Sequence, residues 1–155
     1  MINTLPHPLQ PPTAWSGDLP VTNRYTYGLA LEKFFLALKE EGKILGSRCS
    51  QCQKTYVPIT EYCPNCLGSL TEIVDVGLQG EIYSYTILYQ NLDGSHKESP
   101  EVIGFIKIAD GGLIHRIEGI PVDKIRIGTL VAAQLIPKEE RTGSILDIRS
   151  FKPLA

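Results

Sequence analysis

The sequence predicts a mainly β protein in which an N-terminal helix precedes a four-cysteine metal ribbon and a small C-terminal β-barrel. Three observations predict this fold class. All four cysteines lie between Cys49 and Cys66 as two C-x2-C pairs, residues that favour a helix precede them, and short strand patterns separated by glycines follow them. We therefore divide the chain into an arm at 1–24, a helical segment at 25–45, the ribbon at 46–70 and the barrel at 71–155.

Proline dominates the beginning of the chain, at Pro6, Pro8, Pro11, Pro12 and Pro20. Because proline lacks a backbone N–H and fixes φ, it disrupts both helices and strand ladders. We expect an extended arm over 1–24 rather than a domain. Two roles stay open for it: an arm that wraps a partner subunit, or a loose terminus.

The next segment, from Tyr25 to about Gly42, favours a helix that Gly42 is suited to end. Its apolar residues cover more than one narrow stripe, so we expect the helix to contact its own chain and also a second surface, in a dimer or a larger partner. These apolar residues are Leu29, Leu31, Phe34, Phe35, Leu36 and Leu38.

The cysteine spacing predicts a metal site. Cys49, Cys52, Cys63 and Cys66 form two knuckles, and a strand-like segment followed by Pro58 allows the turn that brings the knuckles together. A tetrahedral Zn²⁺ takes such ligands at about 2.3 Å from the ion. Four thiolates close the site, so the ion supports folding and performs no chemistry.

Two other interpretations of the cysteines are weighed. Disulfides are disfavoured because nothing in the sequence indicates secretion and the cysteines are clustered rather than spread along the chain. Iron is the competing metal, since rubredoxin knuckles have the same spacing, commonly with a glycine directly after the second cysteine of each knuckle. Gln53 and Leu67 occupy those two positions. We therefore favour structural zinc.

Several short strand patterns follow the ribbon, and five or six of them within about eighty residues imply a small barrel. A Greek-key OB barrel fits their number and length, as do other small barrels. The expected strands are Thr71–Val76, Gly80–Gln90, Val102–Ala109, Leu113–Glu118, Thr129–Pro137 and Ser144–Phe151.

Alternation and turn residues support this interpretation. In the last expected strand Leu146 and Ile148 alternate with Asp147 and Arg149, which predicts that the apolar pair faces the core. The Asp-Gly-Gly sequence at 110–112 predicts a tight hairpin between two strands.

The composition is that of an ordinary folded protein, with 43% hydrophobic and 21% charged residues among 155. A net charge of −2 and a sequence pI near 5.9 provide no global positive field, so nucleic acid is a less favoured partner. Neither a signal-peptide pattern nor a long apolar window is present. We expect a cytoplasmic protein whose reduced thiols bind metal.

No recognisable catalytic motif is present: no nucleophile elbow, phosphate-binding loop, dinucleotide fingerprint or H-E-x-x-H. With all four thiols assigned to the metal, no cysteine remains as a nucleophile. His115 and Arg116 together could contact a phosphate, although a lone strand histidine is more often a satisfied structural residue. His7 and His96 have no obvious partner.

Tyr83, Tyr85 and Tyr89 form either a stacking platform for bases or ordinary barrel packing. No basic residue lies between Glu81 and Gln90, which disfavours single-strand binding. Basic residues near the ribbon or in the barrel could hold a phosphorylated small ligand. They are Arg48, Lys54, Lys107, Arg116, Lys124 and Arg126.

The order of these segments resembles the DUF35 family of OB-fold, acyl-CoA-associated proteins with a rubredoxin-like zinc ribbon. The resemblance covers roughly 25–151: the helical sequence YTYGLALEKFF at 25–35, GSRC at 46–49, the knuckle CPNC at 63–66, GEIYSYT at 80–86, and a strand and turn at 104–112. Many ribbons share the cysteine spacing, so the ordered combination of helix, ribbon and barrel carries the specificity.

The resemblance implies a non-catalytic accessory subunit of a thiolase or an HMG-CoA synthase. The helix and ribbon would dock on the thiolase-fold subunits, the barrel would help hold acyl-CoA, and the nucleophilic cysteine would belong to the partner. The ligand roles of the four cysteines carry over. No family motif assigns the CoA contacts, for which we take Arg48, Lys107 and Arg116 as candidates from among the basic residues. The alternatives are a ribbon and OB-fold module for nucleic acid, and a one-iron electron carrier.

Overall fold

The computed structural model describes residues 26–154, so the arm expected at 1–24 lies outside the described residues. The elements are α1 (Gly28–Glu40), β1 (Leu45–Arg48), β2 (Thr55–Tyr56), β3 (Glu72–Asp75), β4 (Gln79–Gln90), β5 (His96–Ile108), β6 (Gly111–Ile117), η1 (Val122–Lys124), β7 (Leu130–Leu135), η2 (Lys138–Glu140), η3 (Ile145–Asp147) and β8 (Ile148–Pro153), where η denotes a 3₁₀ helix. No helix within 26–154 is long and apolar enough to cross a membrane.

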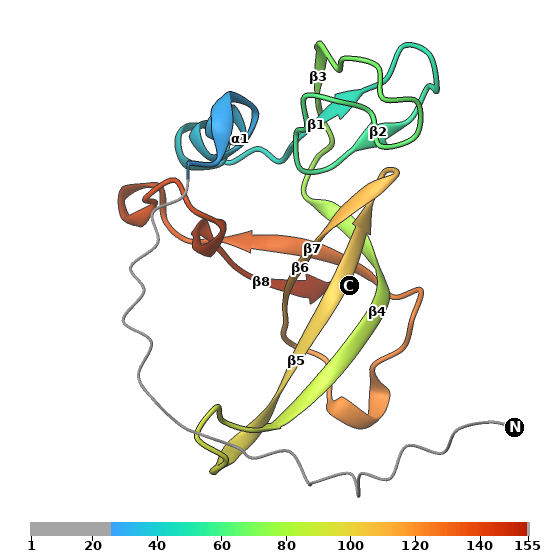
Figure 1. Cartoon of the computed structure of the whole chain (residues 1–155). Helices are drawn as coiled ribbons and strands as arrows, with labels where there is room; N and C mark the ends of the chain where they lie inside the picture. Colours follow the sequence, from blue (N-terminus) through green and yellow to red (C-terminus); the bar gives the residue numbers. More distant parts are fainter. Residues whose placement is uncertain (1–25, 155) are drawn as a thin grey trace, which may run out of the picture.

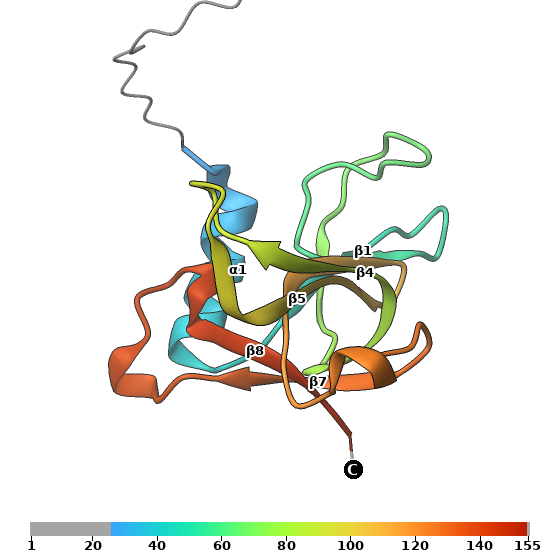
Figure 2. The ribbon, with the colours of Figure 1, turned by 90° about the horizontal axis from the view of Figure 1, so that it is seen from below.

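Two sheets organise the protein. A three-stranded antiparallel sheet in the order β2-β1-β3 carries the ribbon, and β4-β5-β6-β8-β7 form a closed barrel in which only β6 and β8 pair in parallel. Helix α1 and the ribbon lie at one end of the barrel, while the β4–β5 hairpin extends beyond its other end (Figures 1 and 2). The expected fold class, an N-terminal helix with a ribbon and an OB barrel, is confirmed.

Helix α1 is shorter than the expected 25–42 segment but ends as predicted. Gly42 adopts a positive φ of 68°, and the N–H of Lys43 donates to the carbonyl of Ala37. The guanidinium of Arg141, from the segment between β7 and β8, donates to the carbonyl of Lys39 at 3.3 Å. The helix terminus is therefore satisfied partly by a side chain that is distant in the sequence.

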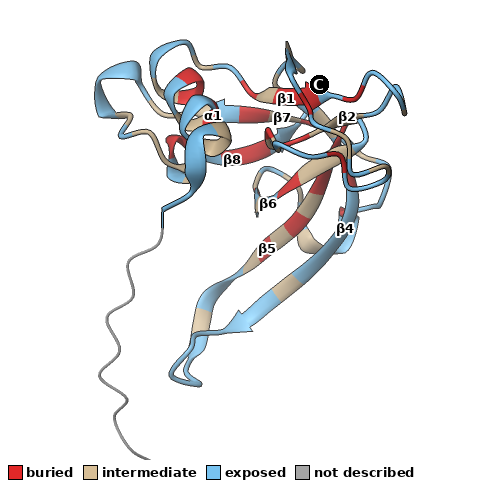
Figure 3. Ribbon diagram, turned by 45° about the horizontal axis from the view of Figure 1, so that its top comes forward, coloured by how far each residue is buried: buried red, intermediate tan, exposed pale blue. Residues whose placement is uncertain are grey.

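Two strand expectations are corrected. The strand at Thr71–Val76, expected in the barrel, pairs with β1 in the ribbon sheet instead. The strand expected at Val102–Ala109 begins earlier, because β5 already starts at His96 and pairs with the end of β4. Beyond the barrel, this hairpin has little covering it on either face, so its polar residues can form a ladder without being buried (Figure 3).

The alternation expected at the end of the chain holds for Ile148, which is buried, and Arg149, which is exposed, but it is wrong for Leu146 and Asp147. Leu146 is 74% exposed, whereas Asp147 is only 1% exposed. Residues 145–147 form η3 rather than strand, and the Asp147 carboxylate accepts hydrogen bonds from the backbone N–H groups of Thr142 and Gly143 at 2.9 and 2.8 Å. The Asp147 carboxylate can be buried because these donors satisfy it, whereas the expected strand would have turned it outward.

One continuous core joins the helix, the ribbon and the barrel. Phe34 and Leu38 of α1 belong to the same buried cluster as Val57 and Ile59 of the ribbon. The cluster continues into the barrel through Ile82, Val102, Ile106, Ile117, Ile125, Val131, Ile148 and Phe151. The helix and the base of the ribbon are therefore fixed on the barrel by shared apolar burial.

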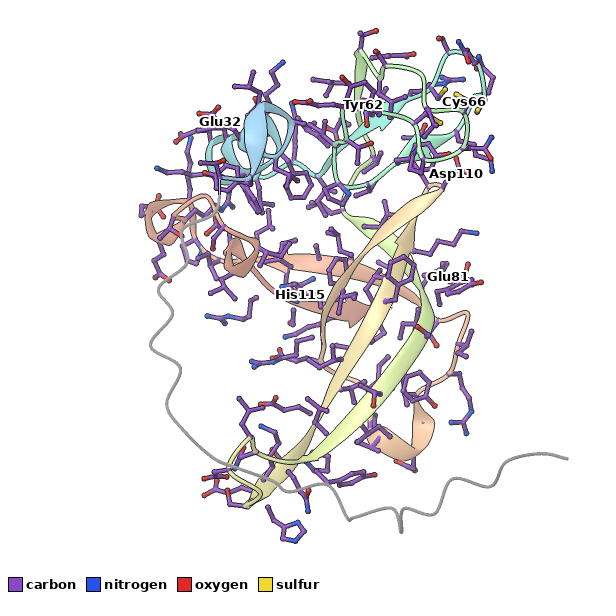
Figure 4. The ribbon with its side chains drawn as sticks, viewed as in Figure 1. Glu32, Tyr62, Cys66, Glu81, Asp110 and His115 are labelled. Carbon is purple, nitrogen blue, oxygen red and sulfur yellow. The ribbon has the colours of Figure 1, made fainter. Side chains whose placement is uncertain are left out.

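The turn between β5 and β6 joins the barrel to the ribbon. The N–H of Asp110 donates to the carbonyl of Thr55 at 2.9 Å, and the Asp110 carboxylate accepts from the N–H of Thr55 at 2.9 Å. Figure 4 shows Asp110 beside the ribbon, at the tip of its hairpin. A Cβ on Gly111 would lie 2.4 Å from the backbone nitrogen of Val57, so glycine is required for this close approach. The hairpin predicted at 110–112 is confirmed.

Replacing Gly111 by alanine should therefore destabilise the protein. The new methyl group meets backbone rather than a movable side chain, so we expect a loss of about 1–3 kcal/mol in the free energy of unfolding. Denaturant unfolding of the metal-loaded protein measures this. Ala109→Gly in the same turn is the control, because Ala109 already has a positive φ of 53° and glycine adds no clash. Equal stability of G111A and the wild type would contradict the close-approach argument.

Candidate metal centre and barrel cavity

The four cysteines converge at the outer end of the ribbon. Cys49 follows β1 directly, and Cys63 and Cys66 lie in the segment between β2 and β3. All four Sγ atoms lie within 4.8 Å of one another, with Cys49 and Cys66 separated by 3.6 Å and Cys52 and Cys63 by 3.9 Å. Figure 4 shows the sulfurs gathered near Cys66.

These distances fit a tetrahedral metal site. Four sulfurs at about 2.3 Å from a central ion are separated by about 3.8 Å from each other. Disulfide bonds of about 2.05 Å do not match the 3.6 Å between Cys49 and Cys66, and all four cysteines are free. Four thiolates fill the coordination of zinc, so the arrangement supports a structural ion with no position left for substrate.

The backbone of each knuckle turns through a left-handed residue. Gln53 and Leu67 have positive φ values of 58° and 60°, and their N–H groups donate to the carbonyls of Cys49 and Cys63 at 2.8 Å. These are the positions at which a glycine is common in rubredoxins. The missing glycines therefore do not indicate a different knuckle backbone, because Gln53 and Leu67 adopt the conformation that glycine favours.

Neighbouring polar groups support the sulfurs. The side-chain amide of Asn65 lies 3.2 Å from Cys52 Sγ, and the Tyr56 hydroxyl lies 3.6 Å from Cys63 Sγ. Burial of Cys63 raises its pKa, but hydrogen bonds from the backbone of Cys66 and from Tyr56 outweigh this and lower the pKa to about 6. The same hydrogen bond to Cys63 raises the pKa of Tyr56 to about 12. The lowered pKa of Cys63 favours the thiolate that a metal requires at this position.

The ribbon has little other means of holding its outer end. Apart from cysteines, the buried cluster around the sulfurs contains only Leu70 among the described residues, with Tyr56 packed against it. So few apolar groups cannot offset the entropy of ordering two long loops. The thiolate cluster is therefore the main stabilising element at this end.

The three candidate CoA contacts do not share one site. Arg116 lines a cavity beside β6, Lys107 lines a separate cavity of about 280 Å³ on the other side of β5, and Arg48 bonds to Gln53 in the ribbon. Arg116 also pairs with Glu101, at 3.7 Å between Nη2 and Oε1. Of the three, only Arg116 lies at an apolar cavity.

We call that space the β6–β8 cavity. It has a volume of about 460 Å³ and is lined by Ile103, Ile114, His115, Arg116, Ile136, Ile145, Leu146, Ile148 and Arg149. Arg149 was not singled out from the sequence. His115 Nε2 lies 3.3 Å from the Ile145 carbonyl, but its buried Nδ1 has no partner among the described residues. The expected satisfied structural histidine is thus only half satisfied.

Asn65→Ala should weaken zinc binding without abolishing it. Loss of an outer hydrogen bond to a metal ligand typically costs about 10–100-fold in affinity. Competition against a chelator of known zinc affinity measures the change, and elemental analysis should give one zinc per wild-type chain. Asn91→Ala, in the distant β4–β5 loop, is the matched control. An N65A protein that holds zinc as tightly as N91A would contradict a role for the amide.

Two family models match the chain in succession. Residues 37–72 match the model described as "ChsH2, rubredoxin-like zinc ribbon domain", and residues 73–135 match "ChsH2, C-terminal OB-fold domain". Together with the clustered thiolates, the first match supports structural zinc. The second agrees with the closed five-stranded barrel.

Solved structures share the fold. A crystal structure of a DUF35-family protein of unknown function from Sulfolobus solfataricus has a TM-score of 0.63 at 27% identity, covering 82% of this chain and 85% of that one. A structure described as "Ltp2-ChsH2(DUF35) aldolase" has a TM-score of 0.59 at 22% identity, covering 84% and 98%. The latter likeness is one of fold alone.

Curated relatives carry the same family name. A "DUF35 domain-containing scaffold protein" of Methanothermobacter thermautotrophicus is 29% identical over 115 residues, which is 71% of this chain and 86% of the relative. A protein of the same description from Methanocaldococcus jannaschii is 31% identical over 125 residues, 76% of this chain and 86% of the relative. With these similarities over most of both proteins, the chain belongs to the DUF35 family.

Proposed function

We propose that this protein is a non-catalytic scaffold subunit that docks on a thiolase-fold enzyme, of the thiolase or HMG-CoA synthase type, and helps hold an acyl-CoA thioester. Two curated relatives are described as scaffold proteins. A structural neighbour is described as an aldolase that includes a DUF35 component. These descriptions support an accessory role beside a partner enzyme.

The chemistry of the described residues supports a role without catalysis. Every cysteine belongs to the metal cluster, where a closed set of thiolates is unsuited to nucleophilic attack. Within residues 26–154 the ring of His115 bonds only to the carbonyl of Ile145, and no carboxylate, hydroxyl or thiol bonds to it as in a catalytic pair. The nucleophile and base of a condensation would then come from the partner enzyme.

The observation that carries the docking proposal is the outer face of α1. Leu29 and Leu36 are seven residues apart, which places them on one side of a helix that turns about 100° per residue. They are 69% and 51% exposed, whereas Phe34 on the opposite side is 1% exposed. A helix held by its own core on one side therefore presents leucines on the other, as a docking helix requires.

The ribbon adds a second exposed apolar position. Leu67 is 77% exposed at the tip of the second knuckle, although its positive φ is costly for a branched side chain. An exposed leucine in a strained conformation is retained more readily where it contacts another protein. Leu67 and the α1 leucines together support docking through the helix and the ribbon.

A rigid scaffold can contribute to acyl transfer through positioning alone. Orientation of a bound thioester and exclusion of water both accelerate condensation without a catalytic side chain on the scaffold. The shared core and the metal-closed ribbon give this protein the rigidity that such a role needs. Reduced thiols suit the cytoplasm, which we propose as its location.

Nucleic-acid binding is the second candidate. Tyr83 and Tyr89 are 58% and 55% exposed and Tyr85 is 37% exposed, so the stripe on β4 is accessible for stacking. The net charge of −2 opposes this function. Retention on single-stranded DNA at about 0.1 M salt, lost as salt rises, would support it. Elution with the unbound fraction would exclude it.

Purification of the tagged protein from its native cells should recover a thiolase-fold protein. Leu29→Glu combined with Leu36→Glu should reduce that recovery by about tenfold or more. The two introduced carboxylates would be buried against the partner without an opposite charge to pair with. Ile127→Glu is the matched control, since Ile127 is 64% exposed in the loop before β7. Quantitative mass spectrometry of the bound fraction measures the change.

Two outcomes would contradict the scaffold proposal. One is recovery of no thiolase-fold protein with the wild-type chain. The other is turnover of acetyl-CoA or acetoacetyl-CoA at enzyme-like rates by the purified chain alone. If the double variant and I127E recovered equal amounts of the thiolase-fold protein, the docking surface would lie elsewhere than on α1.

A further inference from the structure

The outer edge of strand β4 lacks a backbone partner over most of its length. Strand β7 pairs with β4 only at 79–81, and the last backbone bonds on this edge join Ile82 to Gly128 and Thr129. Within residues 26–154 no further backbone group bonds to this edge between 83 and 90. This half of β4 projects beyond the barrel and is largely exposed (Figures 1 and 3). Its free N–H and C=O groups are therefore available to another strand.

The sequence of this edge contains few of the features that keep strands apart. Exposed edges in soluble proteins are commonly protected by charged residues, proline or bulges. Residues 82–89, with the sequence IYSYTILY, contain neither a charge nor a proline. The pairing with β5 is irregular between Ile82 and Ser84 and between Leu88 and Gln90, so the regular part of the strand is 84–88. This regular part forms an uncharged edge.

The second free edge of the same hairpin is protected. Strand β6 pairs with β5 from Val102 onward, which leaves 96–101 of β5 without a second neighbour among the described residues. Charged side chains and a proline disfavour strand pairing along that segment. These residues are Lys97, Glu98, Pro100 and Glu101. The hairpin thus has one edge that resists pairing and one that permits it.

A second copy of this chain fits the β4 edge. A two-fold axis at the centre of the regular part places the exposed Thr86 opposite itself. Tyr85 then faces Ile87, and Ser84 faces Leu88. Threonine pairs and aromatic residues opposite β-branched ones are favourable across antiparallel strands. Self-pairing of a charged strand would set like charges opposite each other, and this segment has none.

The N-terminal arm is less suited to this edge than a second copy. A strand ladder needs a backbone N–H at alternate residues, and the prolines at 6, 8, 11, 12 and 20 lack one. The stretch that follows Pro20 leads directly into α1, which lies at the other end of the barrel from the projecting half of β4 (Figure 1). Identical β4 edges have neither restriction.

We propose that two copies of this protein associate through their β4 edges, antiparallel about a two-fold axis at Thr86, so that their β4–β5 hairpins form one continuous sheet. Backbone bonds supply the affinity, as in other cases of strand addition. Tyr83 and Tyr89, 58% and 55% exposed, flank the regular part, so Tyr83 of one copy comes near Tyr89 of the other. The short contact places the dissociation constant on the order of micromolar or weaker.

This association leaves the other surfaces of each copy accessible. Helix α1 and the ribbon lie at the end of the barrel opposite the projecting hairpin (Figure 1). Two paired copies would therefore keep both of their exposed α1 faces, with Leu29 and Leu36 free to contact other proteins.

Sedimentation equilibrium of the zinc-loaded full chain tests the association. The mass should rise from the 17.1 kDa of one chain towards twice that value as the protein concentration increases from about 1 μM to about 0.5 mM. A mass of one chain at every concentration would overturn the proposal.

A charge at the axis tests the β4 edge itself. Thr86→Lys sets two ammonium groups opposite each other, so the dissociation constant of the dimer should rise by about fivefold or more. Ser99→Lys is the matched control, because it adds the same charge at an exposed position on the protected edge of the same hairpin. Circular dichroism and zinc content establish that both variants are folded. Equal dissociation constants for the two variants would exclude the β4 edge.

Opposite charges test the position of the axis. Thr86→Glu alone should weaken association as T86K does, whereas an equimolar mixture of T86K and T86E should recover it, since residue 86 faces itself at the axis. A mixture of Ser99→Lys with Ser99→Glu should show no such gain over the single variants. If the T86K and T86E mixture stays monomeric where the wild type dimerises, the proposed pairing is wrong.

Partner capture separates this inference from the scaffold proposal, on which it does not depend. T86K should still recover the thiolase-fold protein, because Thr86 lies on neither α1 nor the ribbon. A wild-type chain that dimerises but captures no such protein would refute the scaffold and retain the β4 pairing. A chain that stays monomeric and loses capture in T86K would refute self-association and assign the edge to a strand of the partner.

Discussion

Convergence of four thiolates is the constraint on which the ribbon depends. The outer ribbon buries almost nothing besides its cysteines and Leu70, so its two knuckles are held by sulfur geometry rather than by a core. The same ribbon carries Thr55 and Val57, which bond to the β5–β6 turn. The four sulfurs, which perform no chemistry, thus fix the ribbon backbone that bonds to the β5–β6 turn at one end of the barrel.

Helix α1 is buried on one side and exposed on the other. Phe34 and Leu38 fix α1 on a core shared with the ribbon and the barrel, and Leu29 and Leu36 are largely exposed on the far side. Because the helix is anchored, its exposed leucines need little further ordering when a partner binds. A preorganised surface loses less entropy on association, which suits a scaffold.

The barrel combines closure with one local opening. Its antiparallel pairs satisfy the backbone over most of the circumference, but the single parallel pair between β6 and β8 lets those strands diverge. The segment between β7 and β8 covers part of this opening and is itself stabilised by the buried carboxylate of Asp147. An apolar cavity with Arg149 at its side is the result.

Local patterns were sufficient to predict the helix, its end at Gly42, the metal knuckles and a small barrel. Helix ends, knuckle turns and strands each depend on residues that are close in the sequence. Assigning β3 to the ribbon required knowing which strands pair, and pairing depends on distant backbone groups. Asp147 was mistaken for an outward strand residue because its hydrogen bonds arise only in the folded loop. The cavity beside Arg149 exists only where β6, β8 and η3 come together, since a cavity is formed by residues that the chain separates.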